Sequence, residues 1–161
     1  MRYCVFKFLI ILTFLTACSS SDDPKIAFDK GDYEKSLVLW EARAKDNDAE
    51  AQNYIGIQYF LGLGVEQDYQ EAKKWYELAA KNGLVDAQFN LGLLYDSNKL
   101  GSPDHESAYL WLYAAHRQGN KKAEGRLAGI VSGLGAPKTQ ELHLLAEQYI
   151  INDVIDNENS N

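Results

Sequence analysis

Side chains that could carry chemistry are few in this chain of 161 residues. None of the three histidines, His105, His116 and His143, has another histidine or a cysteine at the spacing of a metal site. The sequence also lacks a G-x-S-x-G motif, a phosphate-binding loop and a dinucleotide fingerprint. We therefore expect no catalytic residues, no metal and no cofactor. A cell-wall hydrolase, which needs a carboxylate pair or a nucleophile in a cleft, is the least favoured class.

Cys18 is the residue with the clearest chemical context. Residues 1–17 begin with basic residues and continue with a short apolar run, the order of an export signal. The segment Leu15-Thr16-Ala17-Cys18 resembles the lipobox of bacterial lipoproteins. This resemblance implies cleavage of residues 1–17 as a signal peptide and attachment of acyl chains such as palmitate to Cys18. An ordinary secretory signal and a transmembrane anchor remain the alternatives.

The residues after Cys18 predict where the domain lies. Two or three acyl chains anchor a protein stably in a membrane, and residues 18–25 form only a short tether. In enteric-type bacteria, a residue other than Asp after the cysteine, here Ser19, usually implies the outer membrane. We therefore expect a lipid-anchored protein of the bacterial envelope that faces the periplasm.

Composition narrows the class of partner. The formal charge is −7 and the sequence has no basic cluster, whereas nucleic-acid binding requires clustered Lys and Arg. An acidic chain instead favours a partner protein with a basic or mixed charge. Hydrophobic residues make up 46% of the chain, which is ample for a packed core.

An internal repeat determines the expected fold. Residues 49–84 recur without a gap as residues 85–120, at an offset of 36 residues. The positions that match are Ala51/Ala87, Gln52/Gln88, Gly56/Gly92, Tyr59/Tyr95, Asp68/Asp104, Ala72/Ala108, Trp75/Trp111, Ala79/Ala115 and Gly83/Gly119. Residues 26–48 give an atypical first unit, and residues 121–151 a degenerate unit with a capping helix. Residues 152–161 are polar and acidic, and we expect a flexible tail there.

Each unit predicts two helices. Glycine inside the first helix, at Gly56 and Gly92, predicts close approach of a neighbouring helix, since interior glycine costs about 1 kcal/mol relative to alanine. The spacing of Trp75 and Trp111 relative to the alanines predicts core positions. In the third unit Ser102 predicts an N-cap, followed by a proline at the first helical position.

The second unit resembles the Sel-one-like repeat, a relative of the tetratricopeptide repeat. The resemblance rests on Gly56, Tyr59, Gly62-x-Gly64-Val65, Asp68-Tyr69, Ala72, Trp75-Tyr76, Ala79-Ala80 and Gly83. It is good in the third unit and partial at both ends. It implies an all-α fold, a right-handed α-solenoid of antiparallel helix pairs with a C-terminal capping helix. It also implies an interaction scaffold without catalysis.

In such stacks the first helix of each unit lines the concave face, which makes it the candidate site for a partner protein. The residues off the buried stripe are Asn53, Tyr54, Ile57, Phe89, Asn90 and Leu93. The alternative is that these side chains pack against the neighbouring repeat. The expected function is an adaptor that binds another envelope or periplasmic protein. The alternative function is an immunity protein that neutralises a periplasm-acting toxin, such as a type VI secretion effector.

Overall fold

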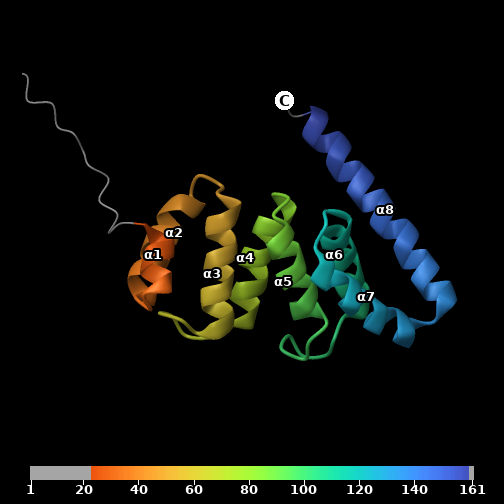
Figure 1. Cartoon of the computed structure of the whole chain (residues 1–161), viewed down its shortest axis with the longest axis horizontal. Coiled ribbons are helices and arrows are strands. Elements are labelled where there is room, and N and C mark those ends of the chain that lie inside the picture. Colours follow the sequence, from red (N-terminus) through yellow and green to blue (C-terminus); the bar gives the residue numbers. More distant parts are fainter. Residues whose placement is uncertain (1–22, 160–161) are drawn as a thin grey trace, which may run out of the picture.

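The computed structural model describes residues 23–159, with side chains as far as Gln148, and this part of the chain is entirely helical. The helices are α1 (Pro24–Asp29), α2 (Tyr33–Ala44), α3 (Ala49–Leu61), α4 (Tyr69–Lys81), α5 (Val85–Tyr95), α6 (His105–Arg117), α7 (Lys121–Leu134) and α8 (Ala136–Asn159). Successive helices pack side by side in chain order, and α8 crosses the far end of the stack (Figure 1). The predicted all-α solenoid is confirmed. Over residues 23–159 no helix combines the length and the apolar character that spanning a bilayer requires.

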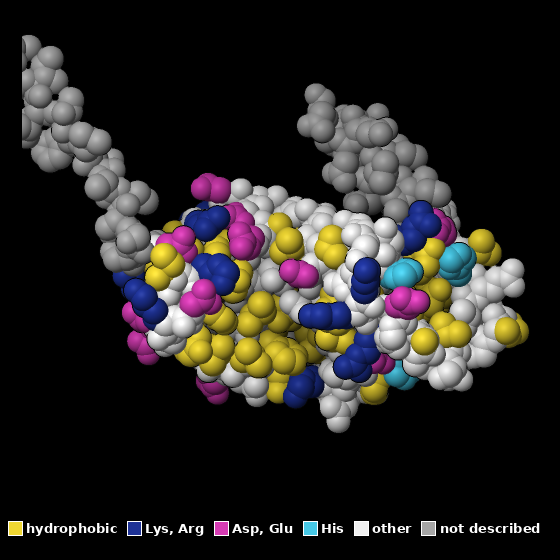
Figure 2. Space-filling model, in the orientation of Figure 1, with side chains coloured by type: hydrophobic (Ala, Val, Ile, Leu, Met, Phe, Trp, Pro, Cys, Tyr) yellow, Lys and Arg dark blue, Asp and Glu magenta, His cyan; other side chains and the backbone are white. Residues whose placement is uncertain are grey.

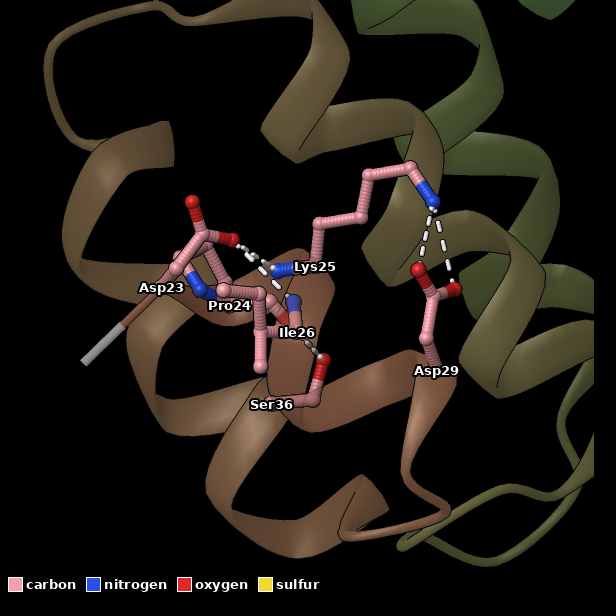
Figure 3. Close-up of polar contacts among 6 residues, drawn as sticks. All are labelled: Asp23, Pro24, Lys25, Ile26, Asp29 and Ser36. Atoms are coloured by element: carbon pink, nitrogen blue, oxygen red, sulfur yellow. Dashed lines mark hydrogen bonds and ion pairs between the residues drawn. The ribbon is translucent and has the colours of Figure 1, made fainter. Parts of the chain in front are cut away.

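The stack begins with the short helix α1. Asp23 caps it, accepting hydrogen bonds from the backbone N–H groups of Lys25 at 2.8 Å and Ile26 at 3.1 Å. The hydroxyl of Ser36, which is fully buried, donates to the carbonyl of Pro24 at 2.9 Å and ties α1 to α2 (Figure 3). These contacts explain how a helix of six residues, too short to be stable alone, is held in place.

The units are joined by residues in the left-handed backbone region. Asn47, Gly83 and Gly119 stand 36 residues apart and have φ angles of 60°, 80° and 93°. Asparagine tolerates this conformation better than most residues with a side chain. In addition, the amide of Asn47 donates to Asn82 at 3.2 Å and accepts from the same side chain at 2.9 Å. The first unit therefore makes the same turn as the others with a different residue.

The second helices of the two central units begin at equivalent aspartates. Asp68 caps α4, and Asp104 caps α6 by accepting hydrogen bonds from the backbone N–H and the hydroxyl of Ser107 at 3.0 and 2.7 Å. The predicted N-cap at Ser102 is therefore wrong. The physical reason is that the Asp104 N–H bonds to the carbonyl of Tyr95 at 2.8 Å, as in the preceding unit, and this places the helix start two residues later.

The central core position is filled by a large residue of each second helix. Trp40, Tyr76 and Leu112 stand 36 residues apart and are 0%, 3% and 0% exposed. Trp75 and Trp111, predicted as core residues, are instead half-buried, and each packs against a core cluster that its own unit shares with the preceding one. The reason is that Tyr76 and Leu112 occupy the position equivalent to Trp40. Trp75 and Trp111, one residue earlier, therefore face the boundary between units.

A repeated amide contact ties the end of the second helix to the start of the first helix within each central unit. Asn82 donates to the side-chain oxygen of Gln52 at 2.9 Å, and Gln118 donates to that of Gln88 at 2.8 Å, one repeat further along. Both glutamines are almost fully buried. Since a buried amide without a partner is costly, these contacts hold the two helices of each central unit together.

The stack ends with α7 and α8. On α8, Leu142 and Ala146 are buried against α6 and α7, whereas Leu145 is 46% exposed. The helix continues to Asn159 because no Gly or Pro interrupts it. It therefore extends into residues 152–161, the region predicted as a flexible tail, and the mobility of that region stays a prediction.

Candidate functional site

A groove lies between α3 and α5, the first helices of the two central units. It has a volume of about 240 Å³, and the residues around it come from three helices. They are Ile57, Phe60 and Leu61 from α3, Tyr76 from α4, and Asn90, Leu93 and Leu94 from α5. We call this feature the α3–α5 groove. Figure 2 shows hydrophobic side chains gathered over the lower half of α3 and towards α5.

The floor of the groove depends on a glycine. A Cβ atom at Gly56 would lie 2.6 Å from Cδ1 of Tyr76, so only glycine lets the tyrosine ring pass beneath α3. The equivalent Gly92 has the same relation to Leu112, also at 2.6 Å. The predicted close approach at these glycines is confirmed, and the neighbour is the second helix of the same unit.

Three of the six residues predicted to bind a partner line this groove: Ile57, Asn90 and Leu93. A fourth, Asn53, is only 6% exposed and accepts a hydrogen bond from Nδ2 of Asn90 at 3.0 Å. Asn53 therefore joins α3 to α5 and does not face a partner. A helical wheel shows which side of α3 a residue faces, but not that α5 packs against that side.

The other two predicted residues lie outside the groove. Tyr54 stacks on Trp40, with ring centroids 4.5 Å apart and planes 4° apart, and meets the edge of Phe28 at 5.4 Å. It belongs to an aromatic cluster of the first unit. Phe89 is half-buried and packs against the core formed by α6, α7 and α8. For these two residues, packing against the neighbouring repeat describes the structure better than exposure to a partner.

Leu61 was missed by sequence reasoning, although it is the most accessible apolar residue of the groove. Its side chain is 52% exposed at the end of α3, just before Gly62 takes the left-handed conformation. Leu61 follows Ile57 by four residues, so the two share one side of α3. Extending the predicted row by one helical turn would have found it.

Lys99, in the loop between α5 and α6, provides a positive charge beside the groove. Its ammonium group donates to the hydroxyl of Tyr69 at 2.9 Å, and lies 4.5 Å from the ring centroid of Tyr69 and 5.8 Å from that of Phe60. Phe60 lines the groove, so the lysine is next to it. The sequence could not show where the lysine of this loop would point.

A second hollow, of about 300 Å³, lies beside α7. Its walls include three glycines, Gly125, Gly129 and Gly133, together with Asp96 and His105. Nδ1 of His105 is 3.0 Å from Oδ1 of Asp96. Among the described residues, no group of three or more His, Cys, Asp or Glu side chains is arranged to hold a metal ion. We find no ligand-directed geometry in this hollow.

The predicted signal peptide and the lipid attachment at Cys18 lie outside the described residues. Nothing in the helical stack bears on them.

Comparison with known proteins identifies the repeat. The family model of the Sel1 repeat matches residues 49–84 and 85–120, the two 36-residue units read from the sequence. The crystal structure of a Sel1 repeat protein from Oxalobacter formigenes is 34% identical, with a TM-score of 0.61, over 65% of this chain and 43% of that one. The structure of c5321, a protective antigen of uropathogenic Escherichia coli with an SLR fold, is 27% identical, with a TM-score of 0.73, over 79% of this chain and 28% of that one. No curated protein sequence matches. The chain thus spans less than half the length of both structures.

Proposed function

Since this chain contains two Sel1 repeats and resembles structures of Sel1-repeat proteins, we propose that it acts as an interaction scaffold or adaptor through the α3–α5 groove. Sel1-repeat proteins generally act in protein–protein interaction, and their fold is typically a non-enzymatic scaffold. The observation that supports the proposal is the groove itself. It combines about 240 Å³ of open space, mostly apolar walls and a half-exposed Leu61. Apolar surface that stays open on a folded domain is typical of a binding site.

The proposal includes anchoring to the cell envelope. In it, the chain is cleaved before Cys18, acylated on that residue and held on the periplasmic side of the membrane, with the outer membrane favoured by Ser19. The support is the lipobox-like sequence. The tether between Cys18 and α1 spans about 20 Å at most, so the groove stays close to the membrane.

The anchor has its own test. Cys18→Ala removes the acylation site, so we expect the protein to move from the membrane fraction to the soluble fraction and to lose incorporation of labelled palmitate. A Cys4→Ala variant is the control, because Cys4 lies in the segment to be removed. Equal palmitate labelling of both variants would contradict the lipid anchor and leave the proposal about the groove unaffected.

The interaction is tested with a pair of leucine variants. Leu61 and Leu78 are 52% and 46% exposed, at the end of α3 and on α4, and only Leu61 lines the groove. Leu61→Asp adds a charge to the groove, whereas Leu78→Asp adds the same charge elsewhere. Both changes spare Phe89 and Leu93, which pack against the core formed by α6, α7 and α8.

The measurement is capture of tagged protein from crosslinked envelopes, followed by mass spectrometry. We expect one protein to be recovered in near-stoichiometric amounts with the wild-type chain and with Leu78→Asp, but not with Leu61→Asp. If the captured protein is a component of the envelope, the chain is an adaptor. If it is a toxin, the chain is an inhibitor. Equal recovery with both variants would contradict the assignment to the groove.

A further inference from the structure

Tyr76, which lines the α3–α5 groove, has a hydroxyl group without a partner among the described residues. Tyr76 is 3% exposed and lines the groove, and its hydroxyl makes no hydrogen bond with any described residue. It is not sealed inside the protein, because among the described residues the fully enclosed side-chain N and O atoms without a partner are Trp40 Nε1 and Gln58 Oε1. Burial raises the pKa of Tyr76, which keeps the hydroxyl neutral and able both to donate and to accept. A buried hydroxyl of this kind is satisfied when a ligand supplies a polar group.

Asn90 adds a second hydrogen-bonding group on the wall. Its Nδ2 donates to Asn53, which fixes the orientation of the amide and leaves Oδ1 as an acceptor beside the groove. A partner helix has its backbone N–H and C=O groups already bonded within the helix. An extended segment has free backbone groups that can meet both Tyr76 and Asn90. The polar groups of the groove therefore favour an extended occupant over a helical one.

Lys99 places a positive charge beside the groove. Within residues 23–159 no carboxylate pairs with it, although the whole chain has a formal charge of −7. Its contacts with Tyr69 and Phe60 hold the ammonium group at the edge of the groove. A carboxylate on the occupant, next to its apolar side chains, would complete this arrangement.

We propose that the α3–α5 groove binds an extended segment of a partner protein in which adjacent aliphatic residues are followed by Asp or Glu. The aliphatic side chains lie against Ile57, Leu61 and Leu93, a backbone group of the segment bonds to the Tyr76 hydroxyl, and the carboxylate pairs with Lys99. The chain's own tether, Ser-Ser-Ser-Asp-Asp at residues 19–23, has no apolar side chain and does not fit. This inference rests on the proposed function and specifies the chemistry of the partner.

The test is selection of a phage-displayed library of random dodecapeptides on the full-length protein in detergent. We expect wild-type protein and Leu78→Asp to enrich peptides with neighbouring Leu, Ile or Val followed by Asp or Glu, and Leu61→Asp to enrich none of them. Enrichment of aliphatic peptides without an acidic residue would overturn the inference and leave the proposed function standing. No enrichment over Leu61→Asp would also overturn it, while capture from envelopes would still decide the proposed function.

Two further variants test the polar groups with one selected acidic peptide as the probe. Lys99→Glu should weaken its binding about tenfold and select basic peptides instead, whereas Lys81→Glu, an exposed lysine on α4, should not. Tyr76→Phe keeps the ring beneath Gly56 and should weaken binding about threefold to tenfold. Tyr109→Phe is the matched control, since Tyr109 is 5% exposed on α6 and away from the groove. Unchanged binding with Lys99→Glu or with Tyr76→Phe would overturn the role given to that residue.

A second copy of the chain is the competing occupant. Sedimentation of the purified protein without peptide distinguishes the two cases. We expect Leu61→Asp and the wild type to have the same oligomeric state. A wild-type dimer that Leu61→Asp abolishes would assign the groove to another copy of this chain and overturn the proposal.

Discussion

Glycine lies inside the first helices in the middle of the stack and at its end, but for different physical reasons. At Gly56 and Gly92 a Cβ atom would lie 2.6 Å from Tyr76 or Leu112, so the crossing of two helices requires the glycine. On α7, three glycines follow one another at intervals of four residues, and a Cβ atom would meet nothing within 4 Å at any of them. Interior glycine costs about 1 kcal/mol relative to alanine. Packing offsets that cost in the middle, but nothing in the described chain offsets it on α7.

The two regions also differ in how their helices are held. In the middle, a large side chain fills the space above a glycine, and amide pairs such as Gln52 and Asn82 join the two helices of one unit. At the end, α8 is held by the buried Leu142 and Ala146 together with three polar contacts. They are Tyr113 with Glu147, Arg117 with Glu147 at 3.4 Å and Lys138 with Glu106 at 3.0 Å. The comparison indicates that the repeat requires glycine where two helices cross at Gly56 and Gly92, and does not require it on α7.

The largest expected effect comes from adding a methyl group in the middle. In Gly92→Ala the new Cβ would press on Cγ of Leu112, at 2.6 Å, and lie 3.2 Å from its backbone nitrogen, so the helices must separate. Overpacking costs about 1–3 kcal/mol, which exceeds the gain in helix propensity of about 1 kcal/mol. We expect the free energy of unfolding in urea to fall by about 1–2 kcal/mol. A rise would contradict the packing described for α5 and α6.

The same substitution on α7 should have the opposite sign. Gly129→Ala places a methyl group in open space, so only the helix propensity changes. We expect the free energy of unfolding to rise by about 1 kcal/mol. Measuring both variants in the same denaturant series sharpens the comparison, because the chemical change is identical. Destabilisation by Gly129→Ala would contradict the open space at Gly129 and show that another part of the chain packs against α7 there.

A smaller effect concerns pH at the end of the stack. Burial, reinforced by the hydrogen bond to Glu147, raises the pKa of Tyr113 to about 12. The folded state therefore holds this proton more tightly than the unfolded chain, in which the pKa is about 10. The stabilisation is complete below about pH 10 and disappears as the pH rises towards 12.

We expect the stability of the wild type to fall more between pH 9 and pH 11.5 than that of Tyr113→Phe, which lacks the titrating group. Burial also raises the pKa of Tyr76 and Tyr109, so the difference between the two proteins is the quantity to measure. Identical pH profiles would show that Tyr113 is not held in this way.

Much of the fold could be predicted because alanine and glycine recur at fixed positions of the repeat. Ala51 and Ala87 are fully buried, and Gly56 and Gly92 lie at helix crossings, as their spacing predicts. The predictions were wrong where the sequence offers two possible N-caps and a tertiary contact decides between them. Ser102 followed by proline is a good local cap, but the bond from the Asp104 N–H to Tyr95 decides where α6 begins.

The candidate site could be predicted only in outline. The spacing of residues placed Ile57, Asn90 and Leu93 on the correct side of their helices, where they line the groove. It could not show that Asn53 bonds to Asn90, because that contact joins residues 37 positions apart. Nor could it place Lys99 beside Phe60, since the path of the loop after α5 is not periodic. Helical periodicity predicts faces, whereas contacts between units require the structure.

Photo-crosslinking from the groove tests the central claim most directly. A benzoylphenylalanine residue at position 61, in cells that make the full-length protein, crosslinks to whatever lies against the groove. The same residue at position 78, on α4 and outside the groove, is the control. We predict a discrete crosslink to one partner protein from position 61, lost when Lys99→Glu is added, and none from position 78. The same crosslinks from both positions, or none from position 61, would contradict the account of the α3–α5 groove as the binding site.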